Sequence, residues 1–523
     1  MTSRPLATLP MTRRSAIATV GSVLGATALS GSLAGRVLAD EQPKLSWAVH
    51  FSPTNLFFDP GITPGTGAPL ILQYAMHDAL IRPIRDQASG LSLAETMEAA
   101  EDGLSYTFTL RPGLKFQNGD PITAEDAKFS FDRYKGANDE LIREFVTEAV
   151  VVDPLTIRYV LSKPWPDFIT IFGTPASGVA WVLPKAYLEE VGDEGFKAAP
   201  IGAGPYRLAD FAAGTEITFE ASEHYWRKTP EVPTLVLRVI PDPATRLAAI
   251  QNGEVDFAYG VKGDLVQQAM AQPDLRVKSS AIPVTNFCVF ASMNDPESPW
   301  SDVRVRKAAN MALDRDGINQ VAYAGLGRTS NSIIPHVMDY YWQPPQTPYD
   351  PEGAKQLLAE AGYPDGFDGG DLNTSSDDEL AELIQANLRS VGITLTLRPT
   401  ERAAYLQKVM EKKLTGLVLT GSGAPGNAAS RLQQFVHSQG SLSYLQDDRL
   451  DAEVQKQAGT LDAATRKQQL DTIQQQLVEE SLFLPVVEFA FPVIIGPRVD
   501  YDGVNGIPGN PYTGPYEDLT IKS

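Results

Sequence analysis

The stretch Gly103–Arg133, with the sequence GLSYTFTLRPGLKFQNGDPITAEDAKFSFDR, constrains the fold more than any other part of the chain. It begins with apolar residues at every second position, a period that predicts a strand with one buried face: Tyr106, Phe108 and Leu110. Residues 114–116 are expected to form a short return strand. A turn is expected at residues 118–120, because Asn and Gly tolerate positive φ.

A helix is predicted directly after this turn. Thr123 and Asp126 have the spacing of a capping box with Asp in place of Glu, which predicts a helix from Ala124 to about Tyr134. A strand, a turn and a helix in this order indicate a packed α/β unit.

Similar signals continue along the chain. Pro200–Arg207, with the sequence PIGAGPYR, predicts a turn that enters a strand. Ser301 is expected to cap a helix that begins in VRVRKA, residues 303–308. Further helices are predicted at residues 70–80, 246–252, 351–361, 380–391, 401–412, 450–458 and 463–480, and strands at residues 45–49, 393–397 and 417–420.

These motifs together resemble the family 5 extracellular solute-binding proteins, the dipeptide, oligopeptide and nickel-binding receptors of bacterial ABC importers. Further matching motifs are IPDPATR at residues 240–246, GEVD at 253–256 and LLAEAGYPDGF at 357–367. The resemblance spans about Leu70 to Leu484. It implies an α/β, two-lobe periplasmic binding protein fold (type II, cluster C), with a hinge and an extra subdomain inserted in lobe one.

The resemblance also implies a division into domains. Lobe one is expected at residues 40–72, 203–285 and 491–523, with the inserted subdomain at 73–202 and lobe two at 286–490. Ligand is expected to bind in the cleft between the lobes, on residues of the first loop, the crossing strand and a lobe-two loop: Phe51, Asn55, Asn286, Phe287, Trp342, Gly421, Ser422 and Gly423. Each aromatic residue among them has core packing as an alternative.

One position departs from the family pattern. Peptide-binding members carry an aspartate in the lobe-two loop that pairs with the ammonium group of the peptide, and Pro425 stands there in this chain. Proline has neither charge nor backbone N–H. The expected ligand is therefore a peptide-like solute, with an opine, an oligosaccharide or a metal chelate as alternatives.

Catalytic and metal-binding motifs are missing from the sequence. The histidines have no metal-ligand spacing: His50, His77, His224, His336 and His437. No G-x-S-x-G, S-x-x-K or H-E-x-x-H motif occurs. The single cysteine, Cys288, lies between apolar residues and is expected in the core. We predict neither enzyme activity nor a cofactor, with an exported hydrolase and a receptor for a signalling partner as alternatives.

The N-terminal residues 1–39 are predicted to be an export signal. Arg13 and Arg14 precede an apolar run, and residues 37–39 (VLA) fit a cleavage site. The twin arginine favours Tat export, with Sec as the alternative. The chain has a net charge of −20, and its first 39 residues contain four arginines and no acidic residue, so the mature protein is more acidic still. This charge argues against nucleic acid as a partner. We expect a periplasmic monomer, not lipid-anchored, that works with a permease and ATPases.

Overall fold

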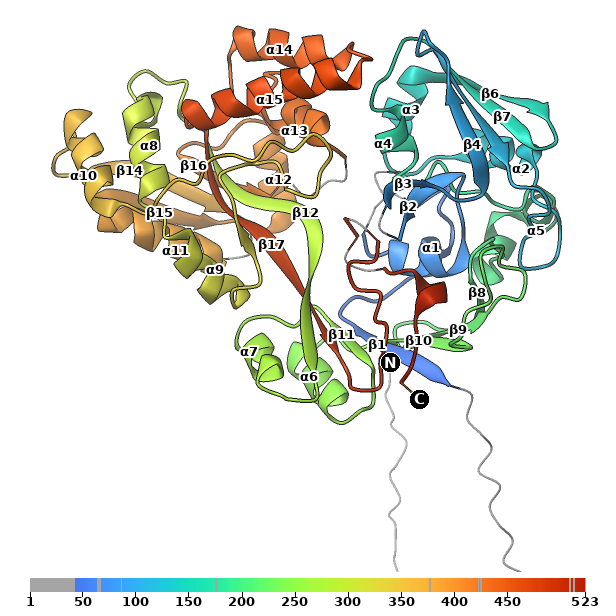
Figure 1. Ribbon diagram of the computed structural model, residues 1–523. Helices are drawn as coiled ribbons and strands as arrows, with labels where there is room; N and C mark the ends of the chain where they lie inside the picture. The colour runs from blue at the N-terminus through green and yellow to red at the C-terminus, as the bar shows by residue number, and fades with distance from the viewer. Residues whose placement is uncertain are drawn as a thin grey trace, which may run out of the picture. The chain divides into compact units, whose positions relative to one another are not determined.

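Two long antiparallel strands, β12 (Arg276–Phe290) and β17 (Phe483–Ile495), run through the centre of the largest sheet (Figure 1). The computed structural model describes residues 43–63, 67–85, 87–174, 177–375, 378–421, 423, 426–507, 509–510 and 513–522. Within these residues the sheet has 11 strands, in the order β15-β14-β16-β12-β17-β11-β1-β10-β9-β8, with β13 paired to β17. The other members are β1 (Lys44–Val49), β8 (Tyr206–Ala212), β9 (Glu216–Ala221), β10 (Thr234–Val239), β11 (Phe257–Tyr259), β13 (Arg328–Thr329), β14 (Phe367–Thr374), β15 (Ile393–Pro399) and β16 (Leu417–Gly421).

Strands β12 and β17 belong to both halves of this sheet. Residues 276–281 of β12 face residues 490–495 of β17 beside β11, whereas residues 285–289 face residues 483–488 beside β16. The pairing register shifts between Ala281 and Thr285. We call β1 and β8–β11 the first half, and β13–β16 the second half. A break in the ladder that joins two packed halves is a natural place for a hinge.

A second sheet, β4-β5-β7-β6, forms what we call the small subdomain, residues 94–198. Its strands are β4 (Ala94–Ala99), β5 (Ser105–Leu110), β6 (Val146–Asp153) and β7 (Thr156–Leu161), and its helices are α2 (Ala124–Arg133), α3 (Asp139–Phe145), α4 (Phe168–Phe172) and α5 (Lys185–Ala198). Strand β5 buries Tyr106, Phe108 and Leu110, and the capping box opens α2, so both predictions are confirmed. The predicted return strand at residues 114–116 is wrong, because Lys115 forms an isolated bridge to Pro121.

The PIGAGPYR segment packs against the end of helix α1 (Leu70–Met76). A Cβ atom on Gly204 would lie 2.4 Å from the backbone carbon of Met76, so glycine is required there. The Gln117 side-chain amide donates to the carbonyl oxygens of Met76 at 2.9 Å and Tyr206 at 2.6 Å. Two motifs far apart in the sequence are thus joined. The predicted helix end at residue 80 is wrong: the chain leaves α1 at residue 77 and enters β2 (Ile81–Ile84), which pairs with β3 (Gln87–Leu91).

Helices cover the second half of the sheet. They are α8 (Val303–Met311), α9 (Arg315–Tyr323), α10 (Pro351–Glu360), α11 (Asp378–Ser390), α12 (Arg402–Met410), α13 (Ala428–Phe435), α14 (Asp448–Ala458) and α15 (Ala463–Glu479). The predicted cap at Ser301 is wrong. Asp302 caps α8 by accepting from the Arg304 N–H at 2.8 Å, since Ser301 belongs to the preceding 3-10 turn, Pro299–Ser301. Cys288 is fully buried, as predicted, and burial raises the pKa of its thiol.

Two helices of the first half lie beside β12 and β17, which we call the crossing strands. They are α6 (Pro243–Gln251) and α7 (Asp264–Met270). Short 3-10 turns occur at Asn55–Phe58 and Tyr516–Asp518. In the described part of the chain, no helix combines the length and apolar character that crossing a membrane requires.

Candidate functional site

A cavity of about 520 Å³ lies where the two halves of the sheet meet. Its volume falls within the roughly 300–1,000 Å³ of ordinary small-molecule sites. Helices α6 and α7 of the first half, α9 and α11 of the second half, and strands β12 and β17 all contribute residues to its lining. Its lining includes His50, Arg246, Lys262, Tyr323, Glu379 and Phe491. The cavity is therefore lined by elements of both halves of the sheet and by the two strands that join them.

The first-half wall of the cavity is built from strand ends. Strands β1, β10 and β11 run parallel, and His50, Pro241 and Gly260 follow their carboxyl ends. Arg246 fixes this edge: its guanidinium donates to the carbonyl oxygens of Pro241 and Gly260, each at 2.7 Å. Ligands of open α/β sheets bind outside the carboxyl ends of their strands. This wall is thus held together by hydrogen bonds and lies at the sheet edge where open α/β folds bind ligands.

The same wall carries positive charge. Arg246 is buried and Lys262 is exposed, and both line the cavity beside His50. Burial, helped by the charges of Arg246 and Lys262, lowers the pKa of His50. Burial also lowers the pKa of Arg246, outweighing the opposite effect of Asp242. The second half contributes one exposed carboxylate to the lining, Glu379. The first-half wall suits an anionic group of a ligand.

Aromatic rings from the crossing strand β17 and from α9 supply the apolar surface. Phe489 lies 5.4 Å from the ring of Tyr323, and Phe491 lies 6.0 Å from that of Tyr259. The Tyr323 hydroxyl accepts a hydrogen bond from Asn286 Nδ2 at 2.9 Å. Since β17 belongs to both halves, relative movement of the halves would change the spacing of these rings.

Three of the residues predicted for the site lie together. Asn286 faces Gly421 across the β12–β16 pair, and a Cβ atom on Gly421 would lie 3.2 Å from Asn286 Oδ1. The Gly423 N–H donates to the Gly421 carbonyl at 2.9 Å. Asn286 connects this cluster to the cavity through Tyr323. Ser422 and Pro425 lie outside the described residues.

Phe287 and Trp342 are placed elsewhere. Phe287 is fully buried against Phe435 and Phe483, so its ring belongs to the core of the second half and has no surface to offer a ligand. The position of Phe287 therefore supports its core-packing alternative. The neighbouring residue, Asn286, is the one that points toward Tyr323.

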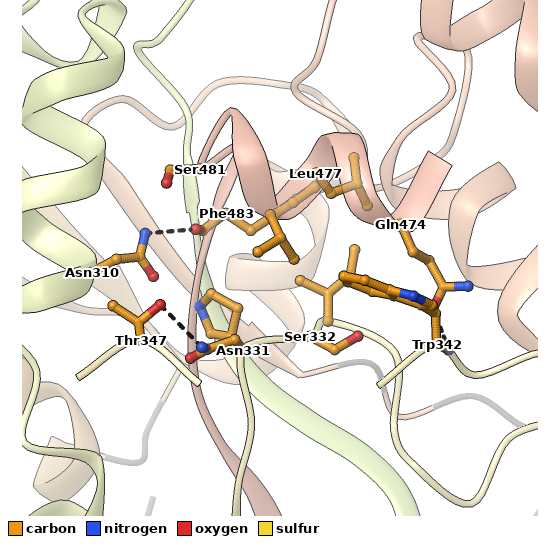
Figure 2. Close-up of a pocket in the computed structure, with 12 residues that line it drawn as sticks. Asn310, Asn331, Ser332, Trp342, Thr347, Gln474, Leu477, Ser481 and Phe483 are labelled. Carbon is orange, nitrogen blue, oxygen red and sulfur yellow. Dashed lines mark hydrogen bonds between the residues drawn. The ribbon is translucent and has the colours of Figure 1, made fainter. Parts of the chain in front are cut away.

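Trp342 lines a different, small cavity inside the second half (Figure 2). Its backbone N–H donates to Gln474 Oε1 at 3.1 Å, and Asn331 on the same wall donates to Thr347 Oγ1 at 3.0 Å. The cavity measures about 30 Å³, which is the space of a water molecule, not of a solute. The position of Trp342 therefore supports a packing role.

The two residues predicted from the first loop lie near the end of β1. Phe51 meets the His50 ring edge-to-face at 5.4 Å, one residue away from the cavity lining. Asn55 is exposed at the start of a 3-10 turn.

Sequence reasoning missed His50, Arg246, Lys262 and Tyr323 as cavity residues. The sequence did contain a signal for His50 and Lys262. His50 directly follows a predicted strand, and Lys262 closely follows a short apolar strand. In this fold class, ligand sites lie at the carboxyl ends of the strands. No local signal marks Tyr323, whose place depends on how α9 packs. Within the described residues, no group of three or more potential metal ligands occurs.

Comparison with known proteins agrees with this architecture. The sequence model of the bacterial extracellular solute-binding proteins, family 5 (middle), matches residues 91–443. The glutathione-binding protein GsiB of Salmonella typhi is 30% identical over 415 residues, which cover 76% of this chain and 80% of that protein.

Solved structures show the same fold. NikA from Brucella suis, solved with Fe(III)-EDTA, superposes with a TM-score of 0.78 at 24% identity, over 92% of this chain and 100% of that one. The periplasmic binding protein DppA from Helicobacter pylori, solved with the peptide STSA, gives 0.69 at 21% identity, over 92% and 98%. The fold is thus that of the two-lobe periplasmic binding proteins, and the chain belongs to the family 5 extracellular solute-binding proteins of bacteria.

Proposed function

We propose that this protein is the substrate-binding component of an ABC importer and captures a peptide-like solute that carries a carboxylate. The observation that carries the proposal is the cavity of about 520 Å³ between the two halves, with Arg246, Lys262 and His50 on one wall. Glutathione, named for the Salmonella relative, is a tripeptide with two carboxylates, and the Helicobacter neighbour was solved with a peptide. Both ligands match the charge of this wall.

The proposed mechanism is non-covalent capture. The carboxylate of the solute approaches Lys262 and the strand ends that Arg246 holds, while Phe489, Phe491 and Tyr323 cover its apolar part. Rotation about β12 and β17 closes the halves and removes water, which strengthens each ion pair. The closed protein then delivers the solute to a membrane permease that cytoplasmic ATPases drive. Residues 1–39 would export the chain to the periplasm, where it works as a monomer.

A thermal-shift and calorimetry panel tests this function. The purified protein is mixed separately with glutathione, dipeptides, their C-terminal amides, an oligosaccharide, an opine and Fe(III)-EDTA. We expect glutathione or a dipeptide to raise the unfolding temperature, since a ligand at a hundredfold excess over its dissociation constant adds about 2.7 kcal/mol of stability. Binding of the oligosaccharide, opine or chelate alone would replace the peptide-like ligand by another class. If no compound of the panel raised the unfolding temperature, the result would contradict the proposed site.

Replacing Lys262 by alanine should weaken binding of the carboxylate ligand about three- to tenfold. An exposed charge-assisted contact contributes about 1 kcal/mol, less than a buried one. Calorimetry at low and high salt measures the change, and the loss should shrink as salt rises. Lys128→Ala is the matched control, because Lys128 is an exposed lysine on α2 paired with Asp132. Equal affinities of Lys262→Ala and the unmodified protein for the ligand would show that Lys262 does not contribute to binding.

A further inference from the structure

Two side chains of opposite charge line the cavity of about 520 Å³ and come from different halves of the sheet. Lys262 follows β11 of the first half, and Glu379 lies in the first turn of α11 in the second half. Both side chains are exposed. Within the described residues, neither side chain makes an ion pair or a hydrogen bond with the other or with a third group. Both charges are therefore available to a solute in the cavity.

The second-half wall around Glu379 favours a cation. Ala322 and Tyr323, the last residues of α9 and its carboxyl-terminal cap side, also line the cavity. The aligned peptide dipoles of a helix place roughly half a negative charge at its carboxyl end, which attracts cations. Among the described residues of the lining, the second half contributes no lysine, arginine or histidine. This wall thus has the opposite electrostatic character to the wall that carries Lys262.

The two walls together select a solute by its charges. A carboxylate is attracted to Lys262 and the neighbouring Arg246, whereas a second carboxylate close to Glu379 would meet a like charge. An ammonium group at Glu379 would instead form a charge-assisted contact. A solute with both groups therefore gains attraction from both walls, and a purely anionic solute gains it from one only.

We propose that Glu379 binds the ammonium group of the solute and makes the cavity selective for zwitterions. This inference rests on the proposed function, because it requires a solute whose carboxylate faces Lys262. Glu379 belongs to α11 and lies outside the lobe-two loop, where this chain has Pro425 in place of an aspartate. Since Lys262 and Glu379 belong to different halves, one bound solute would contact both halves.

A comparison of free and N-acetylated ligands tests the role of Glu379. Glutathione and dialanine, each with a free and an acetylated amine, are titrated calorimetrically into the unmodified protein and into Glu379→Gln. We expect acetylation to weaken binding to the unmodified protein about three- to tenfold, the effect of one exposed charge-assisted contact. Glu379→Gln keeps the shape of the side chain and removes its charge. It should weaken binding of the free amines by the same factor and leave binding of the acetylated ligands unchanged.

Glu382→Gln is the matched control, because Glu382 is an exposed carboxylate of the same helix that does not line the cavity. It should bind all four ligands as the unmodified protein does. The unfolding temperatures of both ligand-free variants should equal that of the unmodified protein, since both positions are exposed. The difference between free and acetylated ligands should shrink as salt rises.

The possible outcomes separate this inference from the proposed function. Equal binding of free and acetylated ligands by the unmodified protein, or equal weakening of both by Glu379→Gln, overturns the role of Glu379 and leaves the carboxylate receptor intact. If a dipeptide C-terminal amide binds as tightly as the free acid, the proposed function is overturned, and the acetylation comparison still decides the role of Glu379. If neither glutathione nor dialanine binds, both proposals are contradicted.

Discussion

Replacing Asp78 by alanine should destabilise the protein by about 3–5 kcal/mol, the cost of removing one partner of a buried ion pair. Asp78 is fully buried, and its Oδ1 lies 2.8 Å from Arg82 Nε. The same oxygen accepts from the Ser92 hydroxyl at 2.6 Å, and Oδ2 accepts from Trp226 Nε1 at 2.8 Å. Burial works to lower the pKa of Arg82, and the charge of Asp78 contributes most to raising it. Without Asp78 the guanidinium would remain buried and lack its nearest counter-charge.

Urea unfolding at neutral pH measures this effect. The control is Asp132→Ala, which removes an exposed pair with Lys128 and should cost at most about 0.5 kcal/mol. Trp226 belongs to the sequence HYW that follows PIGAGPYR, so its bond to Asp78 also ties the first half to the chain that leads into β2. A loss below 1 kcal/mol for Asp78→Ala would show that Glu517, which lies near Arg82, already supplies sufficient counter-charge.

The second large effect is a loss of stability in acid that His77 causes. His77 is fully buried, and burial lowers its pKa to about 4, although its hydrogen bond to the Phe58 carbonyl and the charge of Asp59 act in the opposite direction. In the unfolded chain the pKa is about 6.5. The unfolded state therefore binds the proton first as the pH falls. Stability is unaffected above pH 6.5, is lost progressively between pH 6.5 and 4, and changes no further below pH 4, for a total of about 3 kcal/mol.

Unfolding curves recorded from pH 7.5 to 4 check this prediction. The difference in stability between the unmodified protein and His77→Gln isolates the contribution of His77, because other groups titrate in both. We expect the variant to be less stable at pH 7.5 and to lose about 3 kcal/mol less on acidification. His224→Gln, at an exposed position, is the control and should keep the original slope. Parallel curves for His77→Gln and the unmodified protein would exclude His77 as the source.

Local sequence patterns were sufficient to predict an element where its own residues determine its type and where it begins. Strand β5 alternates because one face is buried, and α2 and α10 begin where Asp126 and Asp350 satisfy free N–H groups. The motif resemblance likewise led to the correct family and fold. The lobe boundaries and the export signal stay predictions, the signal because residues 1–39 lie outside the described part of the chain.

Local sequence patterns gave wrong predictions where contacts with distant parts of the backbone determine the structure. Helix α1 ends at Met76 because PIGAGPYR packs on its last turn and residues 79–80 pair with residues 180–181. Phe287 and Asn286 are neighbours on one strand, and their side chains point to opposite faces. The family resemblance located this segment only to within one residue. It could therefore not tell which of the two side chains faces the core.

The sequence by itself determined the family, the α/β class and most helices, because capping and alternation are short-range effects that a few neighbouring residues control. The tertiary structure alone decided which side chains surround the cavity and which join the small subdomain to the second half of the sheet. Lys262, Tyr323 and Glu379 are separated by more than fifty residues from one another and meet because β12 and β17 pass through both halves. Asp167 and Arg466 are separated by 299 residues and form an ion pair. Their pairing is favoured because a buried arginine without a counter-charge would cost far more free energy than a paired one.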